Sequence, residues 1–152
     1  MSGIKDIWLY ANNIINSARQ MVNEELRPLG LGSAEGNILL HLLTHEDNLR
    51  QDDLVEVLEI SKAAVSRALL SLEKKGFVKR KKDREDKRYS RVLLSEKAHK
   101  IGPILVQIYE NIFSFAAQGI PEDEIKNFIE LFRRVSESFT QARKEKGKWG
   151  VK

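Results

Sequence analysis

The sequence predicts a mainly α-helical fold that carries one small β-hairpin. Three observations support this class. Apolar residues recur at helical spacing over most of the chain, a glycine-ended helix precedes two short β-prone runs, and a highly charged loop lies between these runs. Together they indicate a winged helix-turn-helix with further helices before and after it. We expect a single domain over residues 1–152, with the winged-helix region at 33–95.

The segment that defines this class begins with a short helix after Ser61, which is a good N-cap. An apolar stripe follows at helical spacing, at Val65, Leu69 and Leu72, and we expect it to face a core. The opposite face consists of small residues, a hydroxyl and two cations: Lys62, Ala63, Ser66 and Arg67. Such a face allows close approach to a nucleic-acid groove, where its cations reach base edges or phosphates. An ordinary solvated helix face is the alternative.

A hairpin is predicted directly after this helix. Gly76 follows two lysines and is a good helix stop, because glycine tolerates the left-handed backbone conformation. Short β-prone runs at 77–78 and 92–94 flank the loop 83–88, in which every residue is charged. From Lys62 to Arg91 there are twelve Lys and Arg against four Asp and Glu, a net charge of +8 in a chain whose total is +4. A basic patch this concentrated is typical of a DNA-binding surface.

These residues resemble the MarR (multiple-antibiotic-resistance regulator) family of winged-helix transcription regulators. The resemblance is carried by Ser66-Arg67, the run from Leu72 to Val78 with Arg80, Asp83 and Asp86 with Arg88, and the run from Val92 to Lys97. It is strongest over residues 61–95 and extends more weakly to almost the whole chain. The resemblance implies a homodimer that binds a pseudo-palindromic operator in double-stranded DNA, usually as a repressor and often with release by a small-molecule effector.

The hairpin loop matches the family pattern in its acidic and basic residues. In that pattern an aspartate two residues before an arginine braces the hairpin tip, and the arginine enters the minor groove, whose negative potential is strongest where it is narrow. Asp86 and Arg88 have this spacing, and Asp83 is the second acid of the pattern. The neighbouring cations are expected to contact phosphates: Lys81, Lys82, Arg84 and Lys87. An ordinary charged hairpin is the alternative.

The start of the helix expected at 51–58 departs from the family pattern. Arg50 stands where the family usually has a Thr or Ser cap, so we expect that Asn48 caps the helix instead or that the helix start is distorted. Arg50 also lies where such proteins often touch phosphate, and it is a candidate DNA contact for that reason. Plain solvation of Arg50 is the alternative.

Long amphipathic helices are predicted at both ends of the chain. The first covers residues 4–27, and two more follow the hairpin, because apolar residues recur there at intervals of three and four. A single recognition helix and wing cover few base pairs, so specific binding needs two copies held ~34 Å apart. We therefore expect a homodimer formed by residues 4–27 and 96–146. Closure of an intramolecular bundle by the same apolar stripes is the alternative.

Two further candidate sites lie outside the basic segment. Aromatic and amphipathic residues on the flanking helices are candidates to line an effector crevice, although plain packing is the alternative: Trp8, Tyr10, His41, Tyr109 and Phe113. His41 and His45 lie four residues apart on a helix that we expect to begin after a Ser33 cap, and such a pair beside Glu46 can hold zinc. Because no well-placed third ligand follows, we expect neither a metal site nor a cofactor.

Composition and missing motifs exclude several classes of protein. The chain has no cysteine, which removes disulfides, thiolate metal sites and thiol-based sensing. No stretch is apolar enough to span a membrane and no signal-peptide pattern is present, so we expect a cytoplasmic protein. A Gly-rich phosphate loop and a Ser/His/Asp arrangement are both absent, and helix capping explains Asp52-Asp53. We therefore expect a regulator and not an enzyme, with a non-specific or architectural winged-helix module as the alternative.

Overall fold

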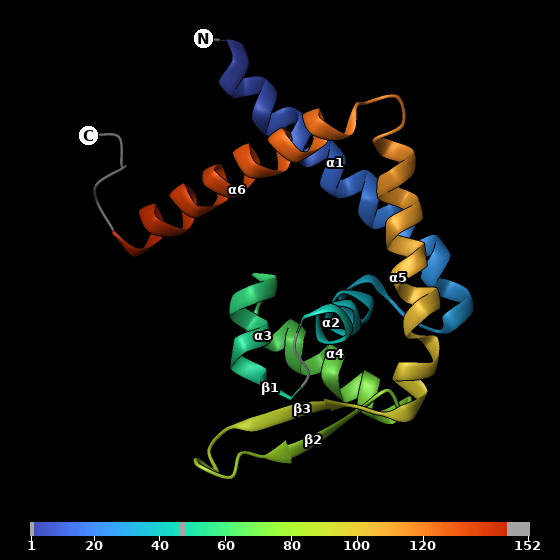
Figure 1. Ribbon diagram of the computed structural model, residues 1–152. Helices are drawn as coiled ribbons and strands as arrows, with labels where there is room; N and C mark the ends of the chain where they lie inside the picture. The colour runs from blue at the N-terminus through green and yellow to red at the C-terminus, as the bar shows by residue number, and fades with distance from the viewer. Residues whose placement is uncertain (1, 46–47, 146–152) are drawn as a thin grey trace. The chain divides into compact units, whose positions relative to one another are not determined.

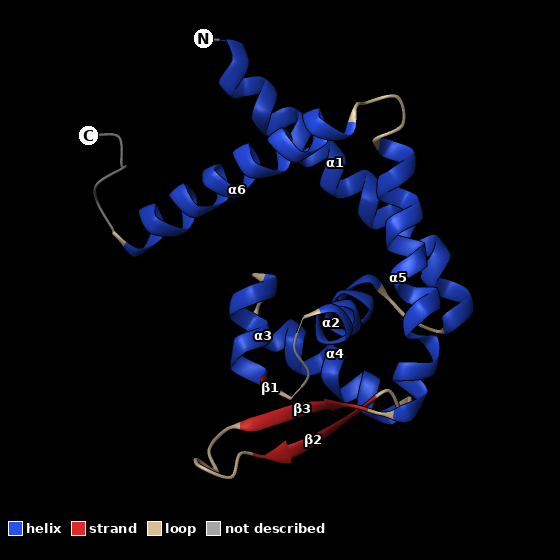
Figure 2. Ribbon diagram, in the orientation of Figure 1, coloured by secondary structure: helices blue, strands red, loops and turns tan. Residues whose placement is uncertain are grey.

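The computed structural model describes residues 2–45 and 48–145, which form helices and one small sheet (Figures 1 and 2). The chain divides into two compact units, residues 1–113 and 114–152, and each is considered by itself. The sheet is antiparallel and has three strands, so the predicted class, mainly α with a β-hairpin, is confirmed. Glu46 and position 146 of the predicted dimerisation segment lie outside the described residues.

The first unit contains the helix-turn-helix and the sheet. In chain order its elements are α1 (Ser2–Leu26), the 3-10 helix η1 (Arg27–Leu29), α2 (Ser33–Thr44), β1 (Leu49–Arg50), α3 (Gln51–Leu58), α4 (Lys62–Lys74), β2 (Val78–Lys82), β3 (Ser90–Leu94) and most of α5 (Glu96–Ala116). The second unit holds α6 (Glu122–Lys144). The helices expected at 4–27, 51–58 and after Ser61 are therefore all present.

The core of the first unit joins its helices to the sheet. Ten large side chains are almost completely inaccessible to solvent: Leu26, Ile38, Leu39, Leu54, Leu69, Leu72, Leu105, Val65, Val78 and Val92. They come from α1, α2, α3, α4, α5 and both hairpin strands. The predicted inward stripe of α4 is thus confirmed, and its burial fixes which face of this helix remains at the surface.

The start of α2 differs from the prediction, and the expected Ser33 cap is wrong. Gly32 occupies the N-cap position, and its backbone N–H donates to Oε1 of Glu35 at 3.1 Å. Ser33 is the first helical residue, and its own N–H donates to Oδ1 of Asn23 on α1 at 2.9 Å. Because these two side chains already satisfy the first free donors of the helix, a serine hydroxyl is not needed there.

The sheet has the strand order β1-β3-β2. Strands β2 and β3 form the predicted hairpin, in a register that runs from Val78 opposite Leu94 to Lys82 opposite Ser90. The two-residue strand β1 was not predicted, and it pairs Arg50 with Arg91 on the outer side of β3. The sheet therefore continues directly into the start of α3.

The N-terminus of α3 also differs from the expectation. Arg50 is the N-cap residue, and the helix is not capped by Asn48, which lies two residues earlier with a left-handed backbone (φ 64°). The backbone N–H of Arg50 donates to Oδ2 of Asp53 at 3.0 Å. A carboxylate on the first turn of the helix thus takes up the donor of the residue that replaces the usual Thr or Ser.

Candidate nucleic-acid interface

The N-terminus of α4 is held as the sequence predicts. Ser61 has an extended backbone, and its Oγ accepts a hydrogen bond from the N–H of Ala64 at 3.1 Å, so the predicted N-cap is confirmed. Lys62, Ala63 and Arg67 are exposed, whereas Ser66 is half-buried. The face predicted to meet a groove is therefore at the surface.

The turn after α4 has the predicted geometry. Gly76 has a φ of 82°, which non-glycine residues rarely adopt. The N–H of Phe77 then donates to the carbonyl of Leu72 at 2.9 Å, which closes the helix end. Phe77 and Val78 are both buried, and they anchor the start of β2 in the core. The hairpin is therefore tied directly to the end of the helix with the cationic face.

We call residues 78–94 the wing and residues 83–89 its tip. At the tip, Asp86 binds both the backbone and the side chain of Arg88: Oδ1 accepts from the Arg88 N–H at 3.1 Å, and Oδ2 lies 2.7 Å from Nη2. Arg88 is 83% exposed, whereas Asp86 is 27% exposed. The carboxylate thus restricts a guanidinium that remains at the surface, which is the geometry expected of a braced tip.

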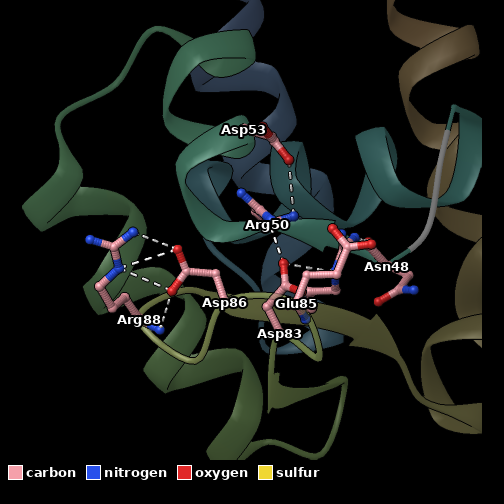
Figure 3. Close-up of polar contacts among 8 residues, drawn as sticks. Asn48, Arg50, Asp53, Asp83, Glu85, Asp86 and Arg88 are labelled. Atoms are coloured by element: carbon pink, nitrogen blue, oxygen red, sulfur yellow. Dashed lines mark hydrogen bonds and ion pairs between the residues drawn. The ribbon is translucent and has the colours of Figure 1, made fainter.

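At the base of the tip lies the buried carboxylate of Asp83, which is 2% exposed (Figure 3). Its Oδ1 accepts from the N–H of Glu85 at 2.9 Å, and its Oδ2 accepts from Nε of Arg50 at 2.6 Å. The Nε of Arg91 lies 3.3 Å from the same Oδ2. One aspartate therefore joins the loop, β1 and β3.

The charges of these groups are reinforced by their partners. The backbone N–H of Glu85 and then the guanidinium of Arg50 lower the pKa of Asp83. The hydrogen bond from Arg88 likewise lowers the pKa of Asp86. The same contacts raise the pKa of Arg50 and of Arg88. Both acids and both bases are therefore ionised at neutral pH.

The basic residues of the first unit include two contrasting groups. Arg50, Arg80, Arg88 and Arg91 each form an ion pair with a carboxylate. Within the described part of the chain, another set of cations has no carboxylate partner: Lys62, Arg67, Lys79, Lys81, Lys82, Arg84 and Lys87. The second group is available to neutralise phosphates, because its charge is not already balanced within the protein.

The predicted effector residues have different environments. Trp8, Tyr10 and Phe113 are 75%, 63% and 52% exposed, whereas Tyr109 is buried at 8%. The Tyr109 hydroxyl donates to Oδ1 of Asn37 at 2.9 Å, so this ring is part of the packing between α5 and α2. A hollow of about 480 Å³ lies elsewhere, beside the wing, and is lined by Asn48, Lys81, Lys82, Asp83, Arg84, Glu85, Arg91 and Leu93. The effector crevice remains a prediction.

The two histidines of α2 lie against each other. The rings of His41 and His45 are stacked with their centroids 4.5 Å apart, and Nδ1 of His45 is 3.0 Å from Oγ1 of Thr44. Burial, followed by the charge of His45, lowers the pKa of His41. Among residues 2–45 and 48–145, no group of three or more His, Cys, Asp or Glu side chains is arranged to hold a metal ion.

The sequence reasoning missed Arg91 and Tyr89 at this site, and it named Asp53 only as a helix-capping residue. Arg91 binds Asp83 and also donates to the carbonyl of Asn48 at 2.7 Å. The ring of Tyr89 lies 4.6 Å from the guanidinium carbon of Arg50, and Asp53 accepts from the Arg50 backbone. Hairpin alternation places Arg91 opposite Lys81, but the pairing with Arg50 depends on β1, which is too short to predict.

The fold and the site define a winged-helix protein with a cationic recognition helix and a braced, cationic wing. Comparison with known proteins agrees with this class. The family model of the MarR family matches residues 29–88. An HTH-type transcriptional regulator of Bacillus cereus strain ATCC 10987 is 32% identical over 129 residues, which cover 85% of this chain and 86% of that relative.

Solved structures are similar over most of the chain. A MarR transcriptional regulator from Methanosarcina mazei Go1 has 25% sequence identity and a TM-score of 0.83, and the match covers 89% of this chain and 99% of that one. A MarR family regulator from Listeria monocytogenes, crystallised with a 26mer DNA, has 23% identity and a TM-score of 0.83, with 97% of both chains covered; this likeness concerns the fold alone. The chain belongs to the MarR family of winged-helix transcriptional regulators. None of the described helices is both long and apolar enough to cross a membrane.

Proposed function

We propose that this chain is a sequence-specific regulator that binds double-stranded DNA as a homodimer on a pseudo-palindromic operator. One observation carries the proposal. Within the described residues, the outer face of α4 and the tip of the wing expose basic side chains that have no carboxylate partner. The Listeria relative bound to a 26mer and a mutant MarR of Escherichia coli bound to operator DNA, which has 22% identity and a TM-score of 0.75, share this fold.

In this proposal the two cationic elements have different tasks. The helix α4 enters the major groove, with Arg67 and Lys62 at base edges or phosphates and the small residues Ser61, Ala63 and Ser66 close to the DNA backbone. The wing contacts the adjacent minor groove through Arg88, which Asp86 orients. The cations around Arg88 bind phosphates: Lys82, Arg84 and Lys87. Phosphate contacts supply affinity, and base contacts supply specificity.

The homodimer is supported by apolar side chains that the single chain leaves exposed. On α6 these are Phe128, Ile129, Leu131, Phe132, Val135 and Phe139, each between 41% and 68% exposed. On α1 they are Ile7, Trp8, Leu9, Tyr10, Ile14 and Ile15, each at least 50% exposed. Apolar patches of this extent are typical of protein–protein interfaces. We assign them to a second copy of the chain, because operator recognition needs two wings and two copies of α4.

Our proposal for the mode of regulation rests on family membership. We propose repression in the cytoplasm, without catalysis, and release by a small molecule that binds near Trp8, Tyr10, His41, Tyr109 or Phe113. Such an effector has to bind one spacing of the two α4 helices more tightly than another, because a ligand with equal affinity for both shifts no population.

A selection of bound fragments from random duplex DNA, at a stated salt concentration, tests the proposal. We expect a consensus with two-fold symmetry and half-sites about one helical turn apart. Fragments without a consensus, bound as tightly as any selected sequence, would instead indicate the non-specific or architectural module. Salt dependence alone does not separate the two, because both release counterions.

A further inference from the structure

We infer that Arg50 is a positioning residue: its ion pair with Asp83 fixes the wing to the start of α3, and the side chain acts on DNA only through the wing. This inference rests on the proposed DNA-binding function and deepens it. The sequence suggested instead that Arg50 touches phosphate. The contacts around Arg50 favour the positioning role.

The backbone of Arg50 belongs to two elements at once. It is the last residue of β1, where it pairs with Arg91 of β3, and it is the N-cap residue of α3. Its N–H is held by Oδ2 of Asp53 at 3.0 Å. The main chain of Arg50 is therefore fixed to the helix, while its side chain extends to the wing tip (Figure 3).

The carboxylate that receives this side chain is buried. Asp83 is 2% exposed, and its Oδ2 lies 2.6 Å from Nε of Arg50 and 3.3 Å from Nε of Arg91. A buried carboxylate is unfavourable unless it is paired and hydrogen-bonded. Loss of Arg50 would thus leave the buried Asp83 carboxylate without its shorter ion pair. The wing tip would then favour a different position.

A chain of contacts continues from Arg50 to the tip. Its guanidinium carbon lies 4.6 Å from the centre of the Tyr89 ring. The Tyr89 N–H donates to the carbonyl of Asp86 at 3.1 Å, and Asp86 binds the guanidinium of Arg88. The orientation of Arg88 therefore depends on contacts that begin at α3.

The substitution Asp83→Asn distinguishes a positioning role of Arg50 from a direct phosphate contact, because the two roles predict opposite changes in DNA affinity. Where charge alone matters, removing a negative charge from a DNA-binding surface strengthens binding. Where the ion pair positions the wing, binding weakens. The asparagine Oδ1 still accepts from Glu85, which places its NH₂ group opposite Nε of Arg50, donor against donor.

Glu85→Gln is the matched control. Glu85 lies on the same loop and is exposed, and its contact with Asp83 uses only the backbone N–H. The change removes the same charge without touching the ion pair. We expect Glu85→Gln to bind the operator as tightly as the wild type or slightly more tightly.

Operator affinity is then measured for Arg50→Ala, Asp83→Asn and the double variant. We expect each single change to weaken binding about tenfold and the double change to weaken it by little more, because both remove one interaction. Arg88→Ala should weaken binding far less in the Arg50→Ala background than in the wild type. The inference would be overturned if the losses of operator affinity caused by Arg50→Ala and Arg88→Ala multiplied, as for two independent phosphate contacts, and if Asp83→Asn bound the operator as tightly as the wild type or more tightly.

Arg50→Lys keeps the charge and protects the test against a variant that does not fold. Lysine binds phosphate as a point charge, so a direct contact would largely survive this change. Lysine lacks Nε and the planar group that lies over Tyr89, so a positioning residue would not be rescued. We expect Arg50→Lys to retain a loss of at least about threefold; full rescue counts against the inference.

Hydrogen exchange of the free protein provides a readout that does not involve DNA. We expect faster exchange of the Asp83 and Glu85 amides in both Arg50→Ala and Asp83→Asn, with α4 unchanged, and no such effect in Glu85→Gln. If the wild type preferred no DNA sequence, the proposed function would be wrong. The hydrogen-exchange result would still test whether Arg50 positions the wing, because it does not involve DNA. Unchanged exchange in both variants would refute it.

Discussion

The hydroxyl of Tyr109 on α5 donates a hydrogen bond to Oδ1 of Asn37 on α2, at 2.9 Å. The ring is 8% exposed, and burial raises the pKa of Tyr109 to about 12. This contact joins a helix that we assign to the dimer to a helix of the DNA-reading core. Burial of the ring, and not this hydrogen bond, raises the pKa of Tyr109, and the shifted pKa leads to a test.

We expect Tyr109 to make folding stability fall at high pH. Above pH 10, the ordinary Tyr pKa, the unfolded chain releases the phenolic proton, whereas the folded chain keeps it up to about pH 12. The unfolded state then binds fewer protons, so the free energy of unfolding decreases by about 1.4 kcal/mol per pH unit in this window. Urea unfolding between pH 9 and about 12 measures the slope.

Tyr109→Phe is the control for this slope. It removes the titrating group and should lose about 1 kcal/mol at neutral pH, because one hydrogen bond disappears and Asn37 is exposed enough to bind water. Lysines also titrate in this range, so the quantity compared is the difference between the two proteins. Equal slopes would show that Tyr109 does not ionise differently in the folded state.

The packing around the Tyr109 hydroxyl explains why residue 36 is a glycine. A Cβ on Gly36 would lie 2.5 Å from Cδ1 of Leu26 and 2.8 Å from the Tyr109 hydroxyl. Leu26 is fully buried and cannot retreat easily. We expect Gly36→Ala to lower the free energy of unfolding by about 1–3 kcal/mol through overpacking, despite the better helix propensity of alanine.

Gly102→Ala is a graded comparison for this prediction. Its Cβ would lie 3.1 Å from Cδ2 of Leu43, the flexible end of a half-buried side chain. The clash is weaker, so we expect a smaller loss than for Gly36→Ala. Thermal unfolding of the two variants side by side measures the difference, and the reverse order would contradict this account of the packing.

The sequence predicted the parts of the fold that depend on local chemistry and periodicity. Val65, Leu69 and Leu72 are buried as expected, and the glycine at 76 has the left-handed backbone that its position implied. The cap of α2 was misplaced by one residue, because Glu35 binds the N–H of Gly32 and a tertiary contact takes up the N–H of Ser33, which binds Asn23, ten residues earlier on another helix. Spacing within one helix does not contain that information.

The candidate site was predictable to a similar degree. Lys62, Arg67 and Arg88 are exposed where the pattern placed them. The ion pair of Arg50 with Asp83 was not predictable, because it joins residues 33 positions apart through a strand of two residues. Pattern reasoning therefore named Arg50 as a candidate site residue but could not identify its contact with Asp83.

Ser61 and Ser33 were both predicted as caps, and they provide a matched test of helix capping. Ser61→Ala removes the hydroxyl that accepts from Ala64 and should cost about 1 kcal/mol of unfolding free energy. Ser33→Ala should cost little, since the contact of Ser33 with Asn23 uses the backbone N–H. Chemical unfolding of both variants measures the contrast, and equal losses would show that Ser33 has a capping role after all.

The proposed homodimer predicts a specific effect of charge on α6. Phe132 is 44% exposed and lies on the apolar stripe of this helix. We expect Phe132→Glu to convert the dimer into a monomer, because it buries an unpaired carboxylate in the interface. Lys126 is not part of the apolar stripe and its side chain is 73% exposed, so Lys126→Glu adds negative charge to the same helix and should leave the dimer intact. Sedimentation velocity at micromolar concentration distinguishes these outcomes; a wild-type monomer would remove the dimer from the proposal.

Arg67 and Arg88 are expected to contribute to DNA binding in different ways. Arg67 lies on the exposed face of α4, so Arg67→Ala should reduce discrimination at one base step by about 1–3 kcal/mol. Arg88 is held at the wing tip by Asp86, so Arg88→Ala should weaken binding and reduce the preference for A·T pairs beside each half-site.

Single-base variants of the selected operator, titrated at fixed salt, measure both effects. Lys79→Ala is the control, since Lys79 is an exposed cation of β2 to which we assign no contact with a base. It should lower affinity slightly and equally for all sequences, as a distant charge does. If Arg67→Ala also lowered affinity equally for operator and random duplexes, α4 would be bound to phosphates and not to bases. The wing and α4 would then supply affinity alone, and specificity would have to come from DNA shape.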